Sequence, residues 1–128
     1  MTVALKLLSI SFNAPIVPVP FKRAAGFGRR FNPPDYSNFK SQLGLFAKHA
    51  MNGREPLSGK IKLYAEIYRN LKPESLNFGD WDNHAKAISD ALNGICYLDD
   101  RQIVDGHILL FKGEPHIFIE LEELHDEK

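Results

Sequence analysis

The chain has 128 residues, of which 44% are hydrophobic and 25% charged, and its sixteen Lys and Arg balance its sixteen Asp and Glu, as in an ordinary single globular domain. The single cysteine, Cys96, excludes an internal disulfide framework and a cysteine-based zinc site. No apolar run has the length needed to cross a membrane, and the N-terminal run lacks a secretory cleavage site, so we expect a cytoplasmic protein without a membrane partner.

The first 53 residues predict a strand, a long loop and a helix. Residues 3–12 alternate in the manner of a strand with both faces partly apolar. Residues 13–34, NAPIVPVPFKRAAGFGRRFNPP, predict a long basic loop, because their prolines and glycines exclude a helix. Loops of this length inside a compact domain are commonly functional. A helix is expected to begin near residues 33–35 and to end at Asn52 and Gly53, where glycine favours a helix stop. Its core-facing stripe is Phe39, Leu43, Phe46, Ala47 and Ala50.

The rest of the chain predicts three strands and a second helix. Residues 59–69 alternate clearly between apolar and polar side chains, and residues 82–93 have the spacing of a helix whose buried stripe is Ala85, Ile88, Ser89 and Leu92. Residues 103–111 and 115–122 are expected to pair as an antiparallel hairpin, and residues 123–128 to form a frayed tail. The expected fold is a single α+β domain over residues 1–128. Its order is β-α-β-α-β-β, with a mixed sheet and two helices packed on it.

The balanced net charge conceals an asymmetry along the chain. Residues 1–72 contain twelve Lys and Arg against three acidic residues, whereas the remainder contains four against thirteen. A basic half is typical of proteins that bind a polyanion. The alternative, that the two halves neutralise each other across the fold, stays open on charge alone.

Carboxylates gather in residues 78–107, which hold six of the sixteen acidic residues. If the segment around Asp80 and Asp82 is extended, their side chains share a face, and two like charges so close favour a cation or a shared proton. Simple structural roles remain open, because Asp82 is also a suitable helix cap and Asp99 a suitable turn residue. Lys86 lies one helical turn after Asp82, placed either for an ion pair or beside a phosphate.

The donor types narrow the choice of metal. Carboxylate oxygens without a histidine and cysteine set favour Mg²⁺ or Mn²⁺ over zinc. Such an ion orients a phosphodiester and lowers the pKa of a bound water. His84 is the alternative ligand within the segment, although we expect it to point away from Asp80.

Residues 79–115, GDWDNHAKAISDALNGICYLDDRQIVDGHILLFKGEP, resemble the central signature of the RusA family of Holliday-junction resolvases. The shared pattern is an acid, an apolar residue, Asp-Asn, a lysine four residues past the second acid, Asp-Ala-Leu, and later Asp-Asp followed by a Gln-Ile-Val type of sequence. The rest of the chain is similar to the family more loosely, in its length, basic loop and order of elements.

The resemblance implies a small endonuclease that binds four-way or otherwise branched DNA as a homodimer and cuts two strands symmetrically with Mg²⁺ (Mn²⁺ is a possible substitute), in recombination and repair. Members are often encoded by phages or prophages. Carried over by position, Asp80, Asp82 and Asp100 are the metal-binding catalytic carboxylates and Lys86 the catalytic lysine near the scissile phosphate. Asn83, Asp90 and Asp99 are supporting residues.

The basic loop supplies the expected DNA contacts. We predict that Lys22, Arg23, Arg29 and Arg30 bind the DNA backbone together with Lys86, by phosphate contacts that weaken as salt rises. Phe21, Phe27 and Phe31 are candidates either for stacking in the junction or for the core.

Two departures from the family pattern stand out. His84 occupies a position that is usually apolar, and Ala24 and Ala25 interrupt the basic run of the loop. Two other functions remain open from the sequence: a branched-DNA-binding module without cleavage, and a nuclease that acts on flaps and other branched DNA.

Overall fold

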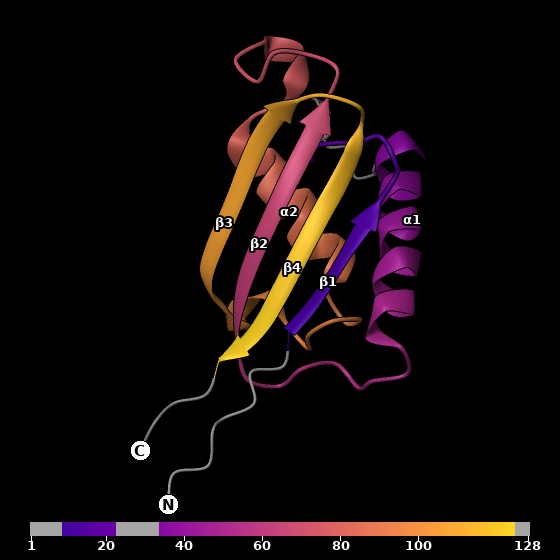
Figure 1. The fold of residues 1–128 in the computed structure, drawn as a ribbon, viewed down its shortest axis with the longest axis vertical. Coiled ribbons are helices and arrows are strands. Elements are labelled where there is room, and N and C mark those ends of the chain that lie inside the picture. Colours follow the sequence, from indigo (N-terminus) through magenta and orange to yellow (C-terminus); the bar gives the residue numbers. More distant parts are fainter. Residues whose placement is uncertain (1–8, 23–33, 125–128) are drawn as a thin grey trace, which may run out of the picture.

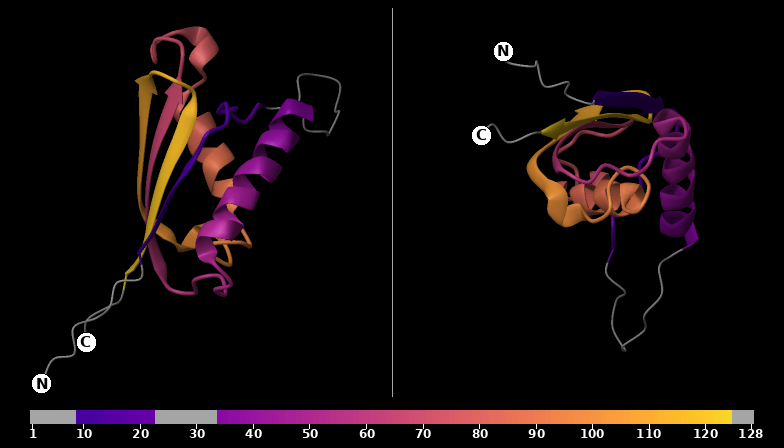
Figure 2. Two further views of the ribbon diagram at one scale, coloured as in Figure 1. Left: turned by 45° about the vertical axis from the view of Figure 1, so that its right-hand side comes forward. Right: turned by 90° about the horizontal axis from the view of Figure 1, so that it is seen from below.

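The structure, a computed structural model, describes residues 9–22 and 34–124. Four strands form one mixed sheet: β1 (Ser9–Ala14), β2 (Lys60–Arg69), β3 (Ile103–Lys112) and β4 (His116–Leu124). The helices are α1 (Pro34–Met51) and α2 (Trp81–Leu92), and η1 (Leu76–Phe78) and η2 (Asp100–Gln102) are short 3₁₀ turns. Both long helices cover the same face of the sheet (Figures 1 and 2). The expected α+β fold and its element order are confirmed, and none of the helices in the described ranges is long and apolar enough to cross a membrane.

The pairing of the last two strands differs from the expected hairpin. The strand order is β1-β4-β2-β3, so β2 lies between β3 and β4, parallel to the first and antiparallel to the second. Residues 113–115 pass over the end of β2, where the Gly113 amide donates to the Arg69 carbonyl at 2.9 Å. A link of three residues is long enough to cross two strand spacings, about 10 Å. A short connection therefore did not imply direct pairing, and the hairpin prediction was wrong.

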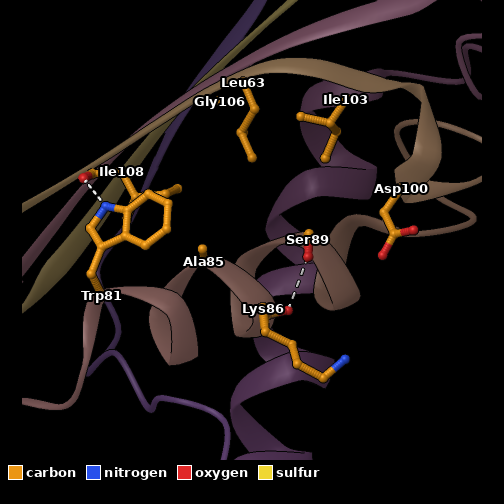
Figure 3. A pocket seen from close by; sticks show the side chains of 9 residues that line it. All are labelled: Leu63, Trp81, Ala85, Lys86, Ser89, Asp100, Ile103, Gly106 and Ile108. Carbon is orange, nitrogen blue, oxygen red and sulfur yellow. Dashed lines mark hydrogen bonds between the residues drawn. The ribbon is translucent and has the colours of Figure 1, made fainter.

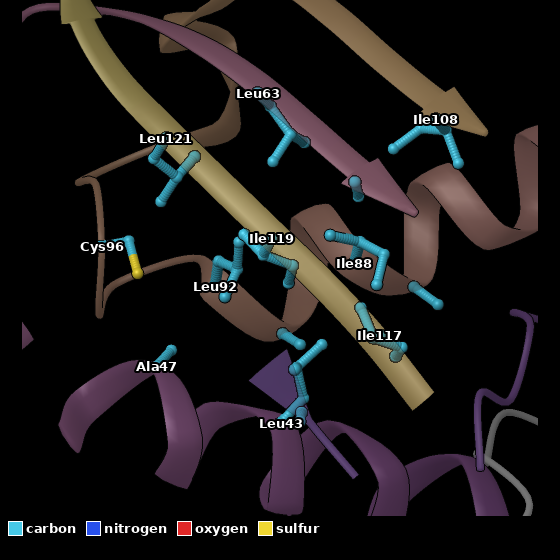
Figure 4. Close-up of a cluster of buried hydrophobic side chains, with 14 of the residues drawn as sticks. Leu43, Ala47, Leu63, Ile88, Leu92, Cys96, Ile108, Ile117, Ile119 and Leu121 are labelled. Atoms are coloured by element: carbon cyan, nitrogen blue, oxygen red, sulfur yellow. The ribbon is translucent and has the colours of Figure 1, made fainter. Parts of the chain in front are cut away.

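The core lies between the sheet and the two helices (Figure 4). From β2, Ile61, Leu63, Ala65 and Ile67 are all buried on the helix-facing side, as the alternation of the sequence predicted. They pack with side chains of α1, α2 and β4, including Leu43, Ala47, Ile88, Leu92, Ile117, Ile119 and Leu121. Burial in this cluster raises the pKa of the Cys96 thiol to about 12, so this cysteine is an inert part of the core.

The buried stripe of α2 is rotated relative to the predicted one. Ile88 and Leu92 are buried as expected, and the other buried side chains of this helix are His84, Ala87 and Ala91. Ala85 and Ser89 instead line a cavity on the side of the helix that faces β3. Periodicity alone placed the stripe one row away, because small residues lie on both flanks of the helix.

The ends of two strands differ from those predicted. β4 continues through Leu124 and pairs there with Lys60, so residues 123 and 124 belong to the sheet rather than to a frayed tail. β1 includes Asn13 and Ala14, so the long loop begins after them. Residues 3–8 of the expected first strand, residues 23–33 of the loop and residues 125–128 of the tail lie outside the described residues.

The face of the sheet away from the helices carries a cluster of aromatic side chains. The Tyr68 ring stacks on His116 at 4.0 Å and on Phe111 at 5.0 Å between ring centroids. The hydroxyls of Tyr64 and Tyr68 both donate to the Glu66 carboxylate between them. These two hydrogen bonds lower the pKa of Glu66.

Candidate active site

The first two candidate carboxylates lie at the start of α2. The helix begins at Trp81, so Asp80 is its N-cap residue, with extended backbone angles of −70° and 151° and no side-chain cap hydrogen bond. Asp82 lies in the first turn of the helix. The two residues are therefore not alternate members of one extended segment, as the sequence had suggested, and Asp82 is not the cap. Both carboxylates lie at the positive end of the helix dipole, which favours negative charge.

A buried network holds the chain just before Asp80. The Phe78 carbonyl accepts hydrogen bonds from Arg69 Nη1 at 2.6 Å and from His84 Nε2 at 2.7 Å. Since a carbonyl can only accept, Nε2 of His84 carries the hydrogen. His84 is only 1% exposed, and burial lowers its pKa. It supports the segment that carries Asp80 from inside the protein, and its Nε2 is engaged there rather than free to bind a metal.

Gly79 allows this network to close. Its φ of 99° is one that residues with a side chain rarely adopt. A Cβ at this position would lie 2.7 Å from Pro20 Cγ and 2.9 Å from His84 Nε2. Only glycine therefore fits between the loop after β1 and the helix that begins at Trp81.

The third carboxylate lies on the turn that precedes β3. Asp99 is the N-cap of η2, where its carboxylate accepts from the Arg101 amide at 2.9 Å in a capping box with Gln102. The side chain of Asp99 is thus committed to the turn. Asp100 instead lines the cavity beside α2, so of this pair only Asp100 is turned toward Lys86.

Gln102 is the residue that fixes this turn, and its role was missed from the sequence. Its Oε1 accepts from the amides of Leu98 and Asp99 at 2.8 and 2.9 Å. Its Nε2 donates to the carbonyls of Leu57 and Gly59, both at 2.8 Å. Four backbone groups from two segments are joined by one side chain. The signal lay in the Gln-Ile-Val of the motif, although its partners 43 and 45 residues away are not visible in a local pattern.

A cavity of about 240 Å³ lies between α2 and β3 (Figure 3). Trp81 closes one end and Asp100 lies at the other, with Lys86 on the helix between them. The remaining walls are mainly apolar, made by Leu63, Ala85, Ser89, Ile103, Gly106 and Ile108. A second hollow on the other side of Lys86 is lined by Phe21, Lys22, Asp82 and Asn83. Lys86 is therefore shared by the hollow that contains Asp82 and the cavity that contains Asp100.

The ammonium of Lys86 has two described neighbours. Its Nζ lies 3.2 Å from Asp90 Oδ2, one turn along α2, and 5.1 Å from the centre of the Phe21 ring. The ion pair predicted as one possibility for Lys86 is thus made with Asp90 rather than with Asp82. Half of the side chain remains exposed, so the ammonium is accessible to an incoming anion.

The three predicted metal ligands are not gathered into one group. Among residues 9–22 and 34–124, no three His, Cys, Asp or Glu side chains lie close enough together to hold a metal ion. The chemistry of the donors nevertheless fits Mg²⁺, which keeps several waters and is commonly held by one or two carboxylates together with substrate phosphate oxygens. The set of Asp80, Asp82 and Asp100 remains a prediction.

The predicted DNA-binding residues divide into two groups. Lys22 lines the hollow with Asp82, whereas Arg23, Arg29, Arg30, Phe27 and Phe31 lie outside the described residues. Phe21 packs edge-to-face on Tyr36 at 5.7 Å, and its amide donates to the Asn83 carbonyl at 3.0 Å. Phe21 and Asn83 therefore fasten the start of the basic loop to α2 and bring Lys22 beside the site.

A comparison with protein-family models identifies a family for this chain. The model of the family described as endodeoxyribonuclease RusA matches residues 15–122. The matched range includes all of the residues that form the cavity, the hollow and the turn. No curated protein matches the chain.

Proposed function

Because the chain belongs to the RusA family of endodeoxyribonucleases, we propose that it is a Mg²⁺-dependent nuclease that resolves four-way DNA junctions by symmetric hydrolysis in recombination and repair. The observation that carries the proposal is the place of Lys86. It lies between the hollow with Asp82 and the cavity with Asp100. A phosphate bound there would contact the ammonium of Lys86, with carboxylates on either side.

Asp80, Asp82 and Asp100 are the residues that would hold Mg²⁺, or Mn²⁺ in its place. When bound, the ion would supply a polarised phosphate and a water of lowered pKa. The fold of the chain holds each of the three carboxylates in place. The Phe78 network holds Asp80, the first turn of α2 carries Asp82, and the turn fixed by Gln102 carries Asp100.

Lys86 supplies positive charge where a phosphodiester gains negative charge as it is hydrolysed. Its ammonium lies between Asp90 and the Phe21 ring. Because half of the Lys86 side chain is exposed, a phosphate oxygen can take the place of the Asp90 carboxylate. Asp90 and Phe21 keep the long side chain directed along the helix in the absence of DNA. Little ordering is then left to be done on binding.

We assign DNA binding mainly to the basic loop. Lys22 lines the hollow beside Asp82 and Lys86, and Arg23, Arg29 and Arg30 follow it in the sequence. Their phosphate contacts would orient the strand without reading bases. Affinity for DNA should therefore fall steeply with salt.

A homodimer is part of the proposal. A four-way junction has two-fold symmetry and is cut at two places, which matches an assembly in which two subunits each bring one site. Light scattering of the purified protein, alone and with a junction, tests this element separately from the chemistry.

The test of function is cleavage of a labelled four-way junction with Mg²⁺, by the wild type and by Asp80→Asn. We expect paired, symmetric nicks from the wild type, and binding without cleavage from the variant. No cleavage with any divalent ion would overturn the nuclease proposal. Equal rates on linear duplex, or faster cleavage of flaps, would overturn the junction preference.

A further inference from the structure

We propose that the apolar cavity between α2 and β3 receives one nucleobase of the DNA, from a nucleotide next to the phosphate that is cut. The inference rests on the proposed nuclease function and adds to it a site for a base. The cavity would make cleavage depend on the presence, and by its shape on the identity, of that base.

The position of the cavity links it to the phosphate. Asp100 lies at one end of the cavity and Trp81 at the opposite end, with Lys86 on α2 between them (Figure 3). A strand whose phosphate is bound at Lys86 has its neighbouring nucleotide within reach of the cavity. No other residue on its walls is charged, so the interior suits the flat, weakly hydrated faces of a base and not a second phosphate.

The size and walls of the cavity fit an aromatic ring. A dry apolar cavity of about 150 Å³ accepts benzene, and this cavity has about 240 Å³. Leu63, Ile103 and Ile108 make one apolar wall, while Ala85 and Gly106 leave room because their side chains are small or absent. The nearest atom to a Cβ built on Gly106 is Ile103 Cγ2 at 3.7 Å, so the space there is open.

Trp81 is suited to stack on the base. Its Nε1 donates to the Ile108 carbonyl on β3 at 2.7 Å, which fixes the ring at one end of the cavity. The residue nevertheless remains 51% exposed, so it is accessible to a stacking partner. Stacking of a base on such a ring is worth about tenfold or more in affinity.

The cost of placing a base in the cavity is low at a junction. Extrusion of a base requires its unstacking and unpairing, and this costs least where pairing is already disturbed. At the crossover of a four-way junction the stacking between arms is interrupted, so part of this cost is already met there. The cavity would therefore favour branched DNA over uninterrupted duplex.

Intrinsic fluorescence gives a direct measurement, because Trp81 is the single tryptophan of the chain. The protein is titrated, without divalent metal, with a four-way junction and with a series in which each nucleotide near the cut is made abasic in turn. We expect the intact junction to quench Trp81 and one abasic position to remove that quenching while DNA binding persists. Equal quenching by every abasic junction would overturn the proposal.

A cavity-filling variant tests the same idea through cleavage. Ala85→Leu places a larger side chain on the cavity wall, and Ser41→Leu adds a leucine at an exposed position of α1. We expect Ala85→Leu to bind the junction and to cut it on the order of tenfold more slowly, and Ser41→Leu to behave as wild type. Unchanged cleavage and unchanged preference among bases in Ala85→Leu would contradict the base site.

The two proposals fail in different ways. Loss of quenching at one abasic position in a protein that cuts no DNA would leave the base site standing and overturn the nuclease. Normal, symmetric cleavage without any dependence on a flanking base would do the reverse.

Discussion

Lys86 and Asp90 form an ion pair of 3.2 Å along α2, and the same ammonium lies over the ring of Phe21. The pair joins two side chains that are 50% and 25% exposed, so its contribution to stability is small. The ion pair matters because it orients the side chain of Lys86. The ammonium is held where the hollow of Asp82 and the cavity of Asp100 meet.

Replacement of this lysine should therefore separate catalysis from folding. We expect Lys86→Ala to lower the cleavage rate by about 10²- to 10³-fold, the usual effect of removing a group that stabilises transition-state charge. Its free energy of unfolding should change by less than about 1 kcal/mol. Lys40→Ala is the matched control, since Lys40 also lies over an aromatic ring, that of Tyr36. A Lys86→Ala protein that cuts at the wild-type rate would remove Lys86 from the mechanism.

Gln102 should show the opposite combination, with stability and activity lost together. Gln102→Ala leaves four backbone groups without their partner, and we expect a loss of about 2 kcal/mol in the free energy of unfolding. Gln102→Glu retains the accepting oxygen but replaces the amide donor with a carboxylate oxygen that faces the carbonyl oxygens of Leu57 and Gly59. Because these oxygens repel one another, this variant should be no more stable than the alanine variant. Urea unfolding measures both. Wild-type stability in either variant would show that this side chain does not fix the turn.

Gly79 offers a steric test of the support behind Asp80. Gly79→Ala meets both an unfavourable φ and close contacts with Pro20 and His84, and we expect destabilisation by about 2 kcal/mol or more. Gly53→Ala has a positive φ of 81° with nothing within 4 Å of the new Cβ, so its cost should be about 1 kcal/mol. Thermal unfolding of the two variants compares them. Equal losses of stability in the two variants would mean that the contacts with Pro20 and His84 add nothing to the cost of the positive φ.

The face of the sheet away from the helices predicts a dependence of stability on pH. Hydrogen bonds from Tyr64 and Tyr68 lower the pKa of Glu66 in the folded state, so the unfolded chain binds a proton there first as pH falls. The stabilisation is complete above the ordinary glutamate pKa and is lost as pH falls through the folded value.

Urea unfolding between neutral pH and about pH 3.5 measures this effect. We expect Glu66→Gln, and equally the double variant Tyr64→Phe with Tyr68→Phe, to lose less stability on acidification than the wild type. The same acid dependence in all three proteins would contradict the role of these hydrogen bonds.

Local patterns predicted the elements of this fold well. The alternation of residues 59–69 identified β2, and the helical spacing placed α1 and α2 within a residue or two of their ends. The partners of the strands were beyond such reasoning. Alternation tells which side chains share a face and leaves open which strand lies alongside, so β2 between β3 and β4 was not foreseen.

The candidate site likewise has some features that local sequence predicted and others that it did not. The acidic motif and Lys86 were visible because their spacing is local. The hydrogen bond from Trp81 to Ile108 and the bonds of Gln102 to Leu57 and Gly59 join residues far apart in the chain. Such contacts depend on the completed fold, and a helix start one residue earlier than expected was enough to change the relation of Asp80 to Asp82.

If cleavage of DNA requires carboxylates on both sides of Lys86, two adjacent aspartates provide the sharpest comparison. Asp99→Asn retains a good N-cap residue for η2, whereas Asp100→Asn changes only the carboxylate that faces the cavity. Both variants are compared with wild type for symmetric cleavage of a four-way junction with Mg²⁺. We predict that Asp100→Asn binds the junction and does not cut it, and that Asp99→Asn still cuts. Full cleavage by Asp100→Asn would show that the Asp100 carboxylate is not needed for the reaction.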